Sequence, residues 1–337
     1  MSKPLDQTDD AGLRALEQDL LEQLKQYRDA GLKLDLTRGK PGPEQLSLSD
    51  ALDGILQGNY RDSTGTDLRN YGGLDGIPEA RELFAEMLGV DSSQLLVGGN
   101  SSLTLMYFAV LFAHYQGVAG ADSAWAKQAG SVKFLAPVPG YDRHFSICEQ
   151  LGIEMIPVPL DDNGPDMDEV ERLVAQDPMI TGIWCVPRFS TPSGCVYSSA
   201  TVKRLAALPR IAGPHFRVFC DNAYAVHTLV ADAPQLDNVM AAFVEAGTAD
   251  ALYLFGSTSK ITFAGAGVAF VAMTENNLRS FKQQLVISQI GPDKINQLRH
   301  VRLLRDRAGI EHHMQGHAAL LKPRFDIVLK HLREGLG

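Results

Sequence analysis

The chain has 337 residues and is 45% hydrophobic, which is enough to bury a core and to build more than one domain. Its net charge is −9 with both signs interspersed, which does not favour a nucleic-acid partner. We expect no signal peptide and no membrane anchor, because the start lacks an apolar core and no apolar run reaches ~18 residues. Four cysteines without CxxC spacing fit reduced thiols in the cytoplasm.

Hydrophobic periodicity predicts where the helices lie. Leucines recur at helical spacing over residues 11–30, and Gly31 follows where a helix would stop. Residues 34–42 then read as an extended segment that breaks into a turn. Further helices are predicted over residues 78–87, 103–115, 167–176, 277–286, 296–307 and 318–334.

Short apolar runs between these helices predict strands. The runs cover residues 132–137, 155–160, 179–186, 216–220, 251–255 and 267–273. Because strands and helices alternate, we expect an α/β fold with a mostly parallel sheet that is covered by helices on both faces.

Two of the predicted strands end in residues that carry chemistry. The run over residues 216–220 leads into Asp221-Asn222-Ala223-Tyr224, and the run over residues 251–255 leads into Gly256-Ser257-Thr258-Ser259-Lys260. An enzyme of pyridoxal 5'-phosphate (PLP) needs a lysine that holds the cofactor as a Schiff base and an acid that pairs with the pyridine nitrogen. A lone lysine or turn aspartate is usually a surface residue, but together Lys260 and Asp221 fit these two roles.

Further motifs accompany this pair in a fixed order along the chain. They are Tyr71-Gly72-Gly73, Gly99-Asn100-Ser101-Ser102, Pro139-Gly140-Tyr141 and residues 187–194, followed by the two segments that hold Asp221 and Lys260. Each motif is weak alone. The ordered set spans most of the chain and resembles the fold type I PLP enzymes and, among them, the aspartate aminotransferases.

The resemblance implies three parts of the chain. Residues 1–48 form an N-terminal helix and arm that belong to a small domain, residues 49–285 form the large PLP-binding domain, and residues 286–337 begin a C-terminal small domain. Only 77 residues follow Lys260, whereas the family continues through further strands and helices that carry the arginine for the substrate α-carboxylate. We therefore expect a truncated chain that lacks this arginine and has weak or absent transamination.

The resemblance also assigns roles around the cofactor ring. Lys260, once displaced by substrate, becomes the base that moves the Cα proton. Asp221 keeps the pyridine nitrogen protonated, and His144 orients that acid. Tyr224 donates to the phenolic oxygen of PLP, and Tyr141 stacks on the ring. Without the resemblance, Tyr141 and His144 read as loop residues and Tyr224 as a core residue.

Other matched residues are assigned to the phosphate, the substrate and a second subunit. Ser101 and Ser102 open a helix whose free N–H groups favour a phosphate, although this pattern alone is more often a serine N-cap. Ser257 is the family's other phosphate hydroxyl. Tyr71 resembles a tyrosine that reaches the phosphate of the neighbouring subunit, which implies a homodimer with shared active sites. The backbone of Gly39 is assigned to the substrate carboxylate.

The chain departs from the family pattern at two motifs. The family's Asn-Pro-Thr-Gly appears as Thr191-Pro192-Ser193-Gly194, and the threonine hydroxyl is shorter than the asparagine that donates to the phenolic oxygen. Residues 265–268 are Gly-Ala-Gly-Val where many relatives place a phosphate arginine. His313 and His317 stand one helical turn apart, but no carboxylate or cysteine completes a ligand set, so no metal is predicted.

Together these motifs predict a PLP-dependent aminotransferase that acts on amino acids and 2-oxo acids, namely aspartate and 2-oxoglutarate. The aspartate specificity follows from the resemblance alone. Two alternatives stay open. A β-lyase or a decarboxylase would use the same lysine and aspartate, and a PLP-binding homologue without catalysis would keep the site but not the turnover.

Overall fold

The computed structural model describes residues 5–33 and 39–336, and the chain divides into two compact units, residues 1–40 and 41–337. Residues 34–38, which belong to the predicted extended segment, lie outside the described residues. The three parts that the family resemblance implies stay predictions.

The first unit holds the helix that the leucine spacing predicts. A short 3-10 helix, η1 (Leu5–Gln7), precedes α1 (Asp10–Asp29), which confirms the prediction. Asp9 begins α1 by accepting a hydrogen bond from the backbone N of Gly12 at 2.9 Å. Gly31 has a φ of 60°, a left-handed conformation that glycine adopts readily after a helix, and it marks the predicted stop.

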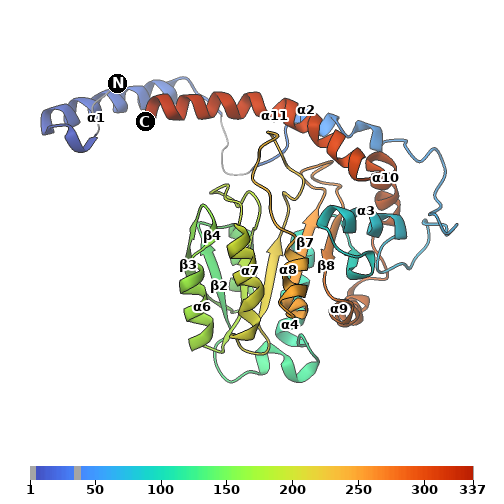
Figure 1. Cartoon of the computed structure of the whole chain (residues 1–337). Coiled ribbons are helices and arrows are strands. Elements are labelled where there is room, and N and C mark those ends of the chain that lie inside the picture. The colour runs from blue at the N-terminus through green and yellow to red at the C-terminus, as the bar shows by residue number, and fades with distance from the viewer. Residues whose placement is uncertain (1–4, 34–38, 337) are drawn as a thin grey trace. The chain divides into compact units, whose positions relative to one another are not determined.

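The second unit is built on one twisted sheet of eight strands (Figure 1). Its spatial order is β1-β8-β7-β6-β5-β2-β3-β4. The five central strands from β7 to β3 run parallel, whereas β8, β1 and β4 pair antiparallel with their neighbours. This confirms the mostly parallel sheet. The bounds are β1 (Leu95–Val97), β2 (Lys133–Val138), β3 (Glu154–Asp161), β4 (Gly164–Pro165), β5 (Ile180–Cys185), β6 (Arg217–Asp221), β7 (Leu252–Ser257) and β8 (Ala269–Ala272).

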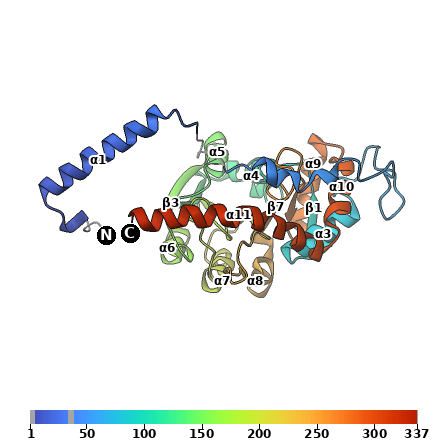
Figure 2. The same cartoon turned by 90° about the horizontal axis from the view of Figure 1, so that it is seen from above.

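Helices cover both faces of this sheet. Figure 2 shows α6, α7 and α8 on one side and α4 and α5 on the other. Among residues 5–33 and 39–336, no helix combines the length and apolar character that a membrane crossing requires. The helices of the second unit are α2 (Pro43–Ser47), α3 (Pro78–Leu88), α4 (Ser102–Tyr115), α5 (Asp142–Gln150), α6 (Met167–Gln176), α7 (Ser199–Ala207), α8 (Val239–Glu245), α9 (Glu275–Ser288), α10 (Lys294–Leu304) and α11 (Arg307–Leu336).

The strands are apolar on both faces because both faces are buried. In β6, Val218 and Cys220 pack into the core cluster shared with α6, α7 and α8. Phe219 between them points the other way, into the cluster shared with α4, α5 and α9. The same alternation in each central strand explains why the strands read as short continuous apolar runs in the sequence.

The C-terminal helices differ from the prediction. The expected helices over residues 296–307 and 318–334 are instead α10, which ends at Leu304, and α11, which begins at Arg307. Arg305 has a φ of 61°, which breaks the helical path at that point. The predicted gap before residue 318 was wrong because Ile310, Met314 and His317 are buried, and this packing outweighs the low helix propensity of nearby glycines.

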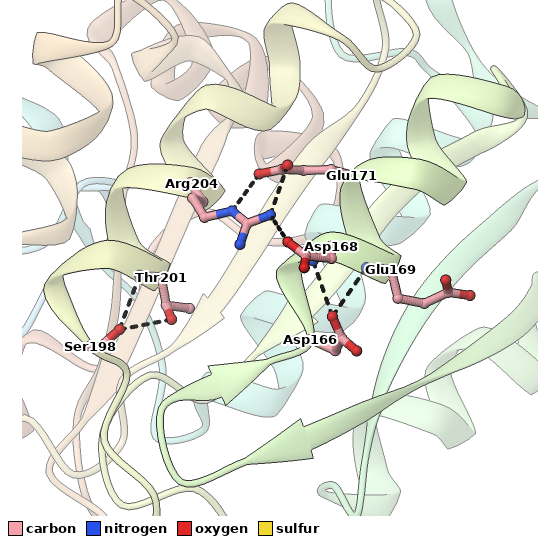
Figure 3. Close-up of polar contacts among 7 residues, drawn as sticks. All are labelled: Asp166, Asp168, Glu169, Glu171, Ser198, Thr201 and Arg204. Atoms are coloured by element: carbon pink, nitrogen blue, oxygen red, sulfur yellow. Dashed lines mark hydrogen bonds and ion pairs between the residues drawn. The ribbon is translucent and has the colours of Figure 1, made fainter.

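Polar contacts fix α6 and join it to α7 (Figure 3). Asp166 begins α6 by accepting hydrogen bonds from the backbone N atoms of Asp168 and Glu169, both at 3.1 Å. Arg204 of α7 reaches across to α6, with its Nε 2.7 Å from Glu171 Oε1 and its Nη2 2.5 Å from Asp168 Oδ1. These two helices cover the β2–β5–β6 part of the sheet, on which the candidate site is built.

Candidate active site

The candidate site lies at the carboxyl ends of β2, β5, β6 and β7, here called the carboxyl edge. These strands are parallel, so their carboxyl ends share one edge of the sheet. The chain order changes direction at β2, which has β3 on one side and β5 on the other. Ligands in open α/β sheets bind at the carboxyl ends near such a switch point. The sequence motifs that follow β2, β5, β6 and β7 therefore gather at a place suited to a ligand.

Asp221 is the last residue of β6 and only 5% of it is exposed. Its Oδ2 accepts a hydrogen bond from His144 Nε2 at 3.1 Å. Its Oδ1 is buried, and among the described residues no protein group donates to it. A buried carboxylate oxygen without a donor is unfavourable, so this atom indicates a place for a ligand that carries an N–H or O–H group.

His144 lies on α5, which begins directly after the Pro139-Gly140-Tyr141 turn. Its ring stacks on Trp184 with a centroid distance of 4.5 Å and an interplanar angle of 9°. The ring of Tyr141 meets it edge-on at 5.1 Å. Because a carboxylate can only accept in this pair, His144 Nε2 carries the proton that it donates to Asp221. Trp184 was not among the predicted site residues, and its only sequence signal is an aromatic inside the strand before the Pro187 motif.

Lys260 lies in a hydrogen-bonded turn that follows β7 directly. Thr258 O accepts from the backbone N atoms of Ile261 and Thr262, both at 2.8 Å. Lys260 Nζ lies 5.1 Å from the centroid of the Tyr224 ring, a favourable cation–π contact. Ser257 ends β7, is buried, and accepts a hydrogen bond from Ser259 N at 3.4 Å. The turn thus presents one amine beside one phenol at the carboxyl edge.

Tyr141 shows that these groups act on one another. Burial raises the pKa of the Tyr141 phenol above its ordinary value. The positive charge of Lys260 opposes this rise in pKa, whereas the negative charge of Asp221 adds to it. One phenol therefore feels both charges. The structure brings together five predicted site residues, namely Lys260, Asp221, Tyr141, His144 and Tyr224.

The start of α4 is tied to the loop that follows Lys260. Ser101 caps α4 by accepting from Thr104 N at 3.4 Å, so the N-cap reading of this motif describes a real contact. Asn100 Nδ2 donates to Gly265 O at 3.1 Å. The partly buried hydroxyl of Ser102 and the free N–H groups of the first turn of α4 stay suitable for an anion.

Three further predicted residues make no described contact with this group. Thr191 is exposed in the loop after β5. Tyr71 is 84% exposed on a turn whose Asn70 and Gly72 carbonyls accept from Lys294 Nζ at 2.9 and 2.7 Å. Gly39 belongs to the first unit.

Arg188 is a buried cation that the sequence analysis missed. Its Nη1 donates to Ala225 O at 2.6 Å, and its Nη2 lies 3.3 Å from Thr228 Oγ1. Burial lowers the pKa of Arg188 below its ordinary value. Arg188 lies inside the Pro187–Gly194 motif, which was the only available signal. It holds the loop that carries Tyr224.

This sheet, covered on both faces and with a lysine and an aspartate at one carboxyl edge, is the architecture of the fold type I transferases. The chain belongs to the aspartate aminotransferase family, because the family profile described as aspartate amino-transferase matches residues 7–337. Family, fold and enzyme class are therefore as predicted, and the chain is an aminotransferase.

Individual relatives agree with this assignment. A putative aminotransferase of Mycolicibacterium smegmatis is 47% identical over 309 residues, which make up 91% of this chain and 72% of that protein. An aspartate aminotransferase of Corynebacterium glutamicum is 44% identical over 321 residues, or 95% of this chain and 74% of that protein. A crystal structure of an aspartate transaminase from C. glutamicum has a TM-score of 0.93 at 42% identity, covering 99% of this chain and 78% of the other.

Proposed function

We propose that the chain is a cytoplasmic, PLP-dependent aminotransferase that transfers the amino group of aspartate to 2-oxoglutarate. The observation that carries the proposal is the buried Asp221 Oδ1, to which no group in residues 5–33 or 39–336 donates, at the same carboxyl edge as Lys260. The curated relative and the solved structure from C. glutamicum described above bear the names aspartate aminotransferase and aspartate transaminase, which supports aspartate as the substrate.

The residues at the carboxyl edge fit PLP. A protonated pyridine nitrogen would give Asp221 Oδ1 the donor that it lacks, while His144 keeps Oδ2 in place. PLP, when bound, supplies an aldehyde that condenses with amines and a protonated ring that draws electrons away from the substrate Cα. Lys260 Nζ would hold the cofactor and then take the proton from the substrate Cα. Tyr141, which feels the charges of both Asp221 and Lys260, would border the ring.

In the family, a tyrosine and an asparagine both donate to the phenolic oxygen of PLP. Here Tyr224 would do so without the asparagine. The exposed Thr191 makes no side-chain hydrogen bond within the described part of the chain, whereas the Tyr224 ring lies beside Lys260 Nζ. We therefore assign the phenolic oxygen of PLP to Tyr224, with Thr191 as a lesser contributor. Arg188 supports this assignment because its guanidinium fixes Ala225, the residue next to Tyr224.

The phosphate and a second subunit complete the proposed site. Ser101, Ser102 and Ser257 would give hydroxyls to the phosphate, together with the first N–H groups of α4. Tyr71 is exposed on an anchored turn, which suits contact with the phosphate of a partner subunit in a homodimer. Gly39 would contact the substrate carboxylate. Sedimentation velocity tests the homodimer, which a purely monomeric PLP-loaded protein would exclude.

The covalent role of Lys260 has a direct test. The PLP-loaded protein should show a visible absorbance band that is absent in Lys260→Ala and present in the control Lys282→Ala, whose lysine pairs with Asp75. Borohydride reduction and peptide mapping should place the phosphopyridoxyl mass on Lys260. A label on another residue would overturn the proposal. Product analysis with aspartate then separates amino transfer from β-elimination and decarboxylation.

A further inference from the structure

The turn that carries Lys260 needs hydrogen-bond donors from elsewhere in the chain. The N–H groups of Ile261 and Thr262 both bond to Thr258 O, at the start of the turn. The turn does not continue into a helix, so the carbonyls of Lys260 and Ile261 receive no donor from following turns. Buried backbone carbonyls are almost always paired, and side chains must therefore supply these donors.

Three histidines supply them. His313 and His317 lie one turn apart on α11, and their Nε2 atoms are 2.8 and 2.7 Å from Ile261 O. His227, from the loop after β6, has its Nε2 3.2 Å from Lys260 O. A carbonyl oxygen only accepts, so each histidine carries its proton on Nε2. Two separate parts of the chain thus donate hydrogen bonds to the backbone at Lys260 and Ile261. We call these contacts of His227, His313 and His317 the grip.

A second hydrogen bond, on the far side of the ring, supports the contact that His317 makes. His317 bears its proton on Nε2, so its Nδ1 accepts from Gln45 Nε2 at 3.4 Å. Gln45 is buried and its Oε1 accepts from Gly42 N at 3.0 Å. His313 Nε2 also lies 3.4 Å from Ser49 Oγ. The direction in which the His317 ring donates is therefore set by Gln45 of α2.

A fourth histidine, His300, contacts Thr262, but it accepts a hydrogen bond where the other three donate one. His300 Nδ1 donates to Asn296 O at 2.8 Å, which leaves Nε2 as an acceptor for Thr262 Oγ1 at 2.8 Å. The Lys260 turn thus meets histidines at three consecutive residues. Such a concentration exceeds what packing alone requires, because an apolar side chain would fill the same space without a hydrogen bond.

Histidine suits this place because it can donate while neutral. Burial lowers the pKa of His227, His313 and His317, so all three are uncharged at neutral pH. A lysine or arginine donor would add a positive charge beside Lys260 and disfavour the protonated form of its amine. Neutral donors hold the backbone without this effect.

We propose that His227, His313 and His317 are positioning residues that fix the direction of Lys260 through its backbone and leave its amine free to move. The consequence for catalysis rests on the proposed function of Lys260, whereas the grip itself does not. The Nε2 atoms of His313 and His317, whose spacing raised the question of a metal, both point at the carbonyl oxygen of Ile261.

Matched amide substitutions test the grip. In His317→Gln the amide N can replace Nε2, whereas in His317→Asn the same amide ends too short to reach Ile261 O. The same pair is made at His227, and His114→Gln and His114→Asn serve as controls, since His114 is buried on α4 away from this turn. Hydrogen exchange of residues 258–263 is measured with and without PLP, followed by the pH midpoint of the visible band and by kcat and KM.

The Asn variants should raise exchange in the turn about threefold to tenfold, even without PLP, because one hydrogen bond is lost. In the loaded protein their band midpoint should move by about half a pH unit or more, and kcat should fall about tenfold or more with little change in KM. The Gln variants should stay near the parent, as should both His114 variants.

Equal behaviour of the Asn and Gln variants would overturn the inference, as would unchanged exchange in the Asn variants. If an Asn variant fails to fold, the Gln variant at the same position still tests the inference. A shifted pH midpoint of the visible band in that Gln variant would contradict the grip. A parent protein without a visible band would refute the proposed function of Lys260 and leave the exchange result standing.

Discussion

The neighbouring strands β6 and β7 each bring one charged residue to the carboxyl edge, but they hold it in different ways. Asp221 is the last residue of β6, and its side chain is fixed by His144, which in turn stacks on Trp184. Lys260 lies three residues beyond β7, and the carbonyls of Lys260 and Ile261 accept from histidines. The Lys260 amine lies 5.1 Å from the centroid of the Tyr224 ring.

The difference fits the roles proposed above for the two residues. A carboxylate that faces a ring nitrogen acts by staying in one place, so a side-chain clamp on Asp221 is an advantage. A lysine that holds a cofactor and then moves a proton needs a mobile amine on a fixed base. A hydrogen bond to the amine would oppose that motion, whereas a hydrogen bond to the backbone does not. The hydrogen bonds therefore hold the backbone at Lys260 and leave its side-chain amine without a fixed partner.

The largest expected effect comes from removing the charge at the β6 end. Asp221→Asn keeps the shape of the side chain but no longer stabilises a protonated ring nitrogen. We expect kcat to fall about 10²–10³-fold, the usual result of losing one preorganised electrostatic partner, with PLP still attached to Lys260. Steady-state kinetics and the visible band of the same samples measure both quantities.

The matched control for that change is Asp177→Asn. Asp177 follows α6 just before β5 and pairs at 2.8 Å with Lys133 at the start of β2, so it is an ion-paired aspartate at the opposite ends of these strands. Its loss should leave kcat within about twofold and should lower stability by no more than ~1 kcal/mol. Similar losses of kcat in both variants would show that any charge change in this sheet harms the enzyme, which contradicts a specific role for Asp221.

The β6 end could be predicted from the sequence more fully than the β7 end. Asp221 and His144 both follow apolar runs in recognisable motifs, and strands that end at one edge bring such motifs together. The pairing of His144 with Asp221 was predicted and is present at 3.1 Å. Trp184 was missed because an aromatic inside a buried strand looks the same whether it packs against another apolar residue or against a histidine.

The support of Lys260 could not be read from the sequence. His313 and His317 follow Lys260 by 53 and 57 residues, in a stretch where no helix was predicted, and they act on a backbone atom that has no sequence signature. Their one visible pattern is a spacing of one helical turn, from which no metal was predicted and which does not indicate a bond to a carbonyl. The contact of Thr191 with the cofactor stays a prediction, and in the structure this residue lies exposed in the loop after β5.

As the pH falls, the turn that carries Lys260 after β7 should lose stability before the end of β6 that carries Asp221. Burial lowers the pKa of His227 to about 4, against about 6.5 for an exposed histidine. Between these values the unfolded chain binds more protons than the folded one, so stability is complete above about pH 6.5 and is lost as the pH falls toward 4. This residue alone should account for about 3 kcal/mol, and the lowered pKa values of His300, His313 and His317 act in the same direction.

Urea unfolding at pH 7.5 and pH 4 measures the total loss, and hydrogen exchange locates it. Residues 258–263 should exchange faster at pH 4, after correction for the intrinsic rate, while β6 keeps its protection. In His227→Gln the pH-dependent part of the loss should shrink, because glutamine does not titrate. A loss of the same size in His227→Gln would assign the acid sensitivity to other groups.

The smallest effect is expected away from both His144 and the histidines that contact the Lys260 turn. Arg204→Met keeps the apolar stem but removes the ion pairs with Glu171 and Asp168 that join α7 to α6. Both pairs are partly exposed, so the free energy of unfolding should fall by only about 0.5–1 kcal/mol, with kcat and exchange of the Lys260 turn unchanged. Arg172→Met, which breaks a pair with Glu169 inside α6, should cost still less, because it joins no second element. A fall in kcat for Arg204→Met would mean that the position of α7 affects the carboxyl edge. The placement of Asp221 and Lys260 would then depend on the helices that cover the sheet.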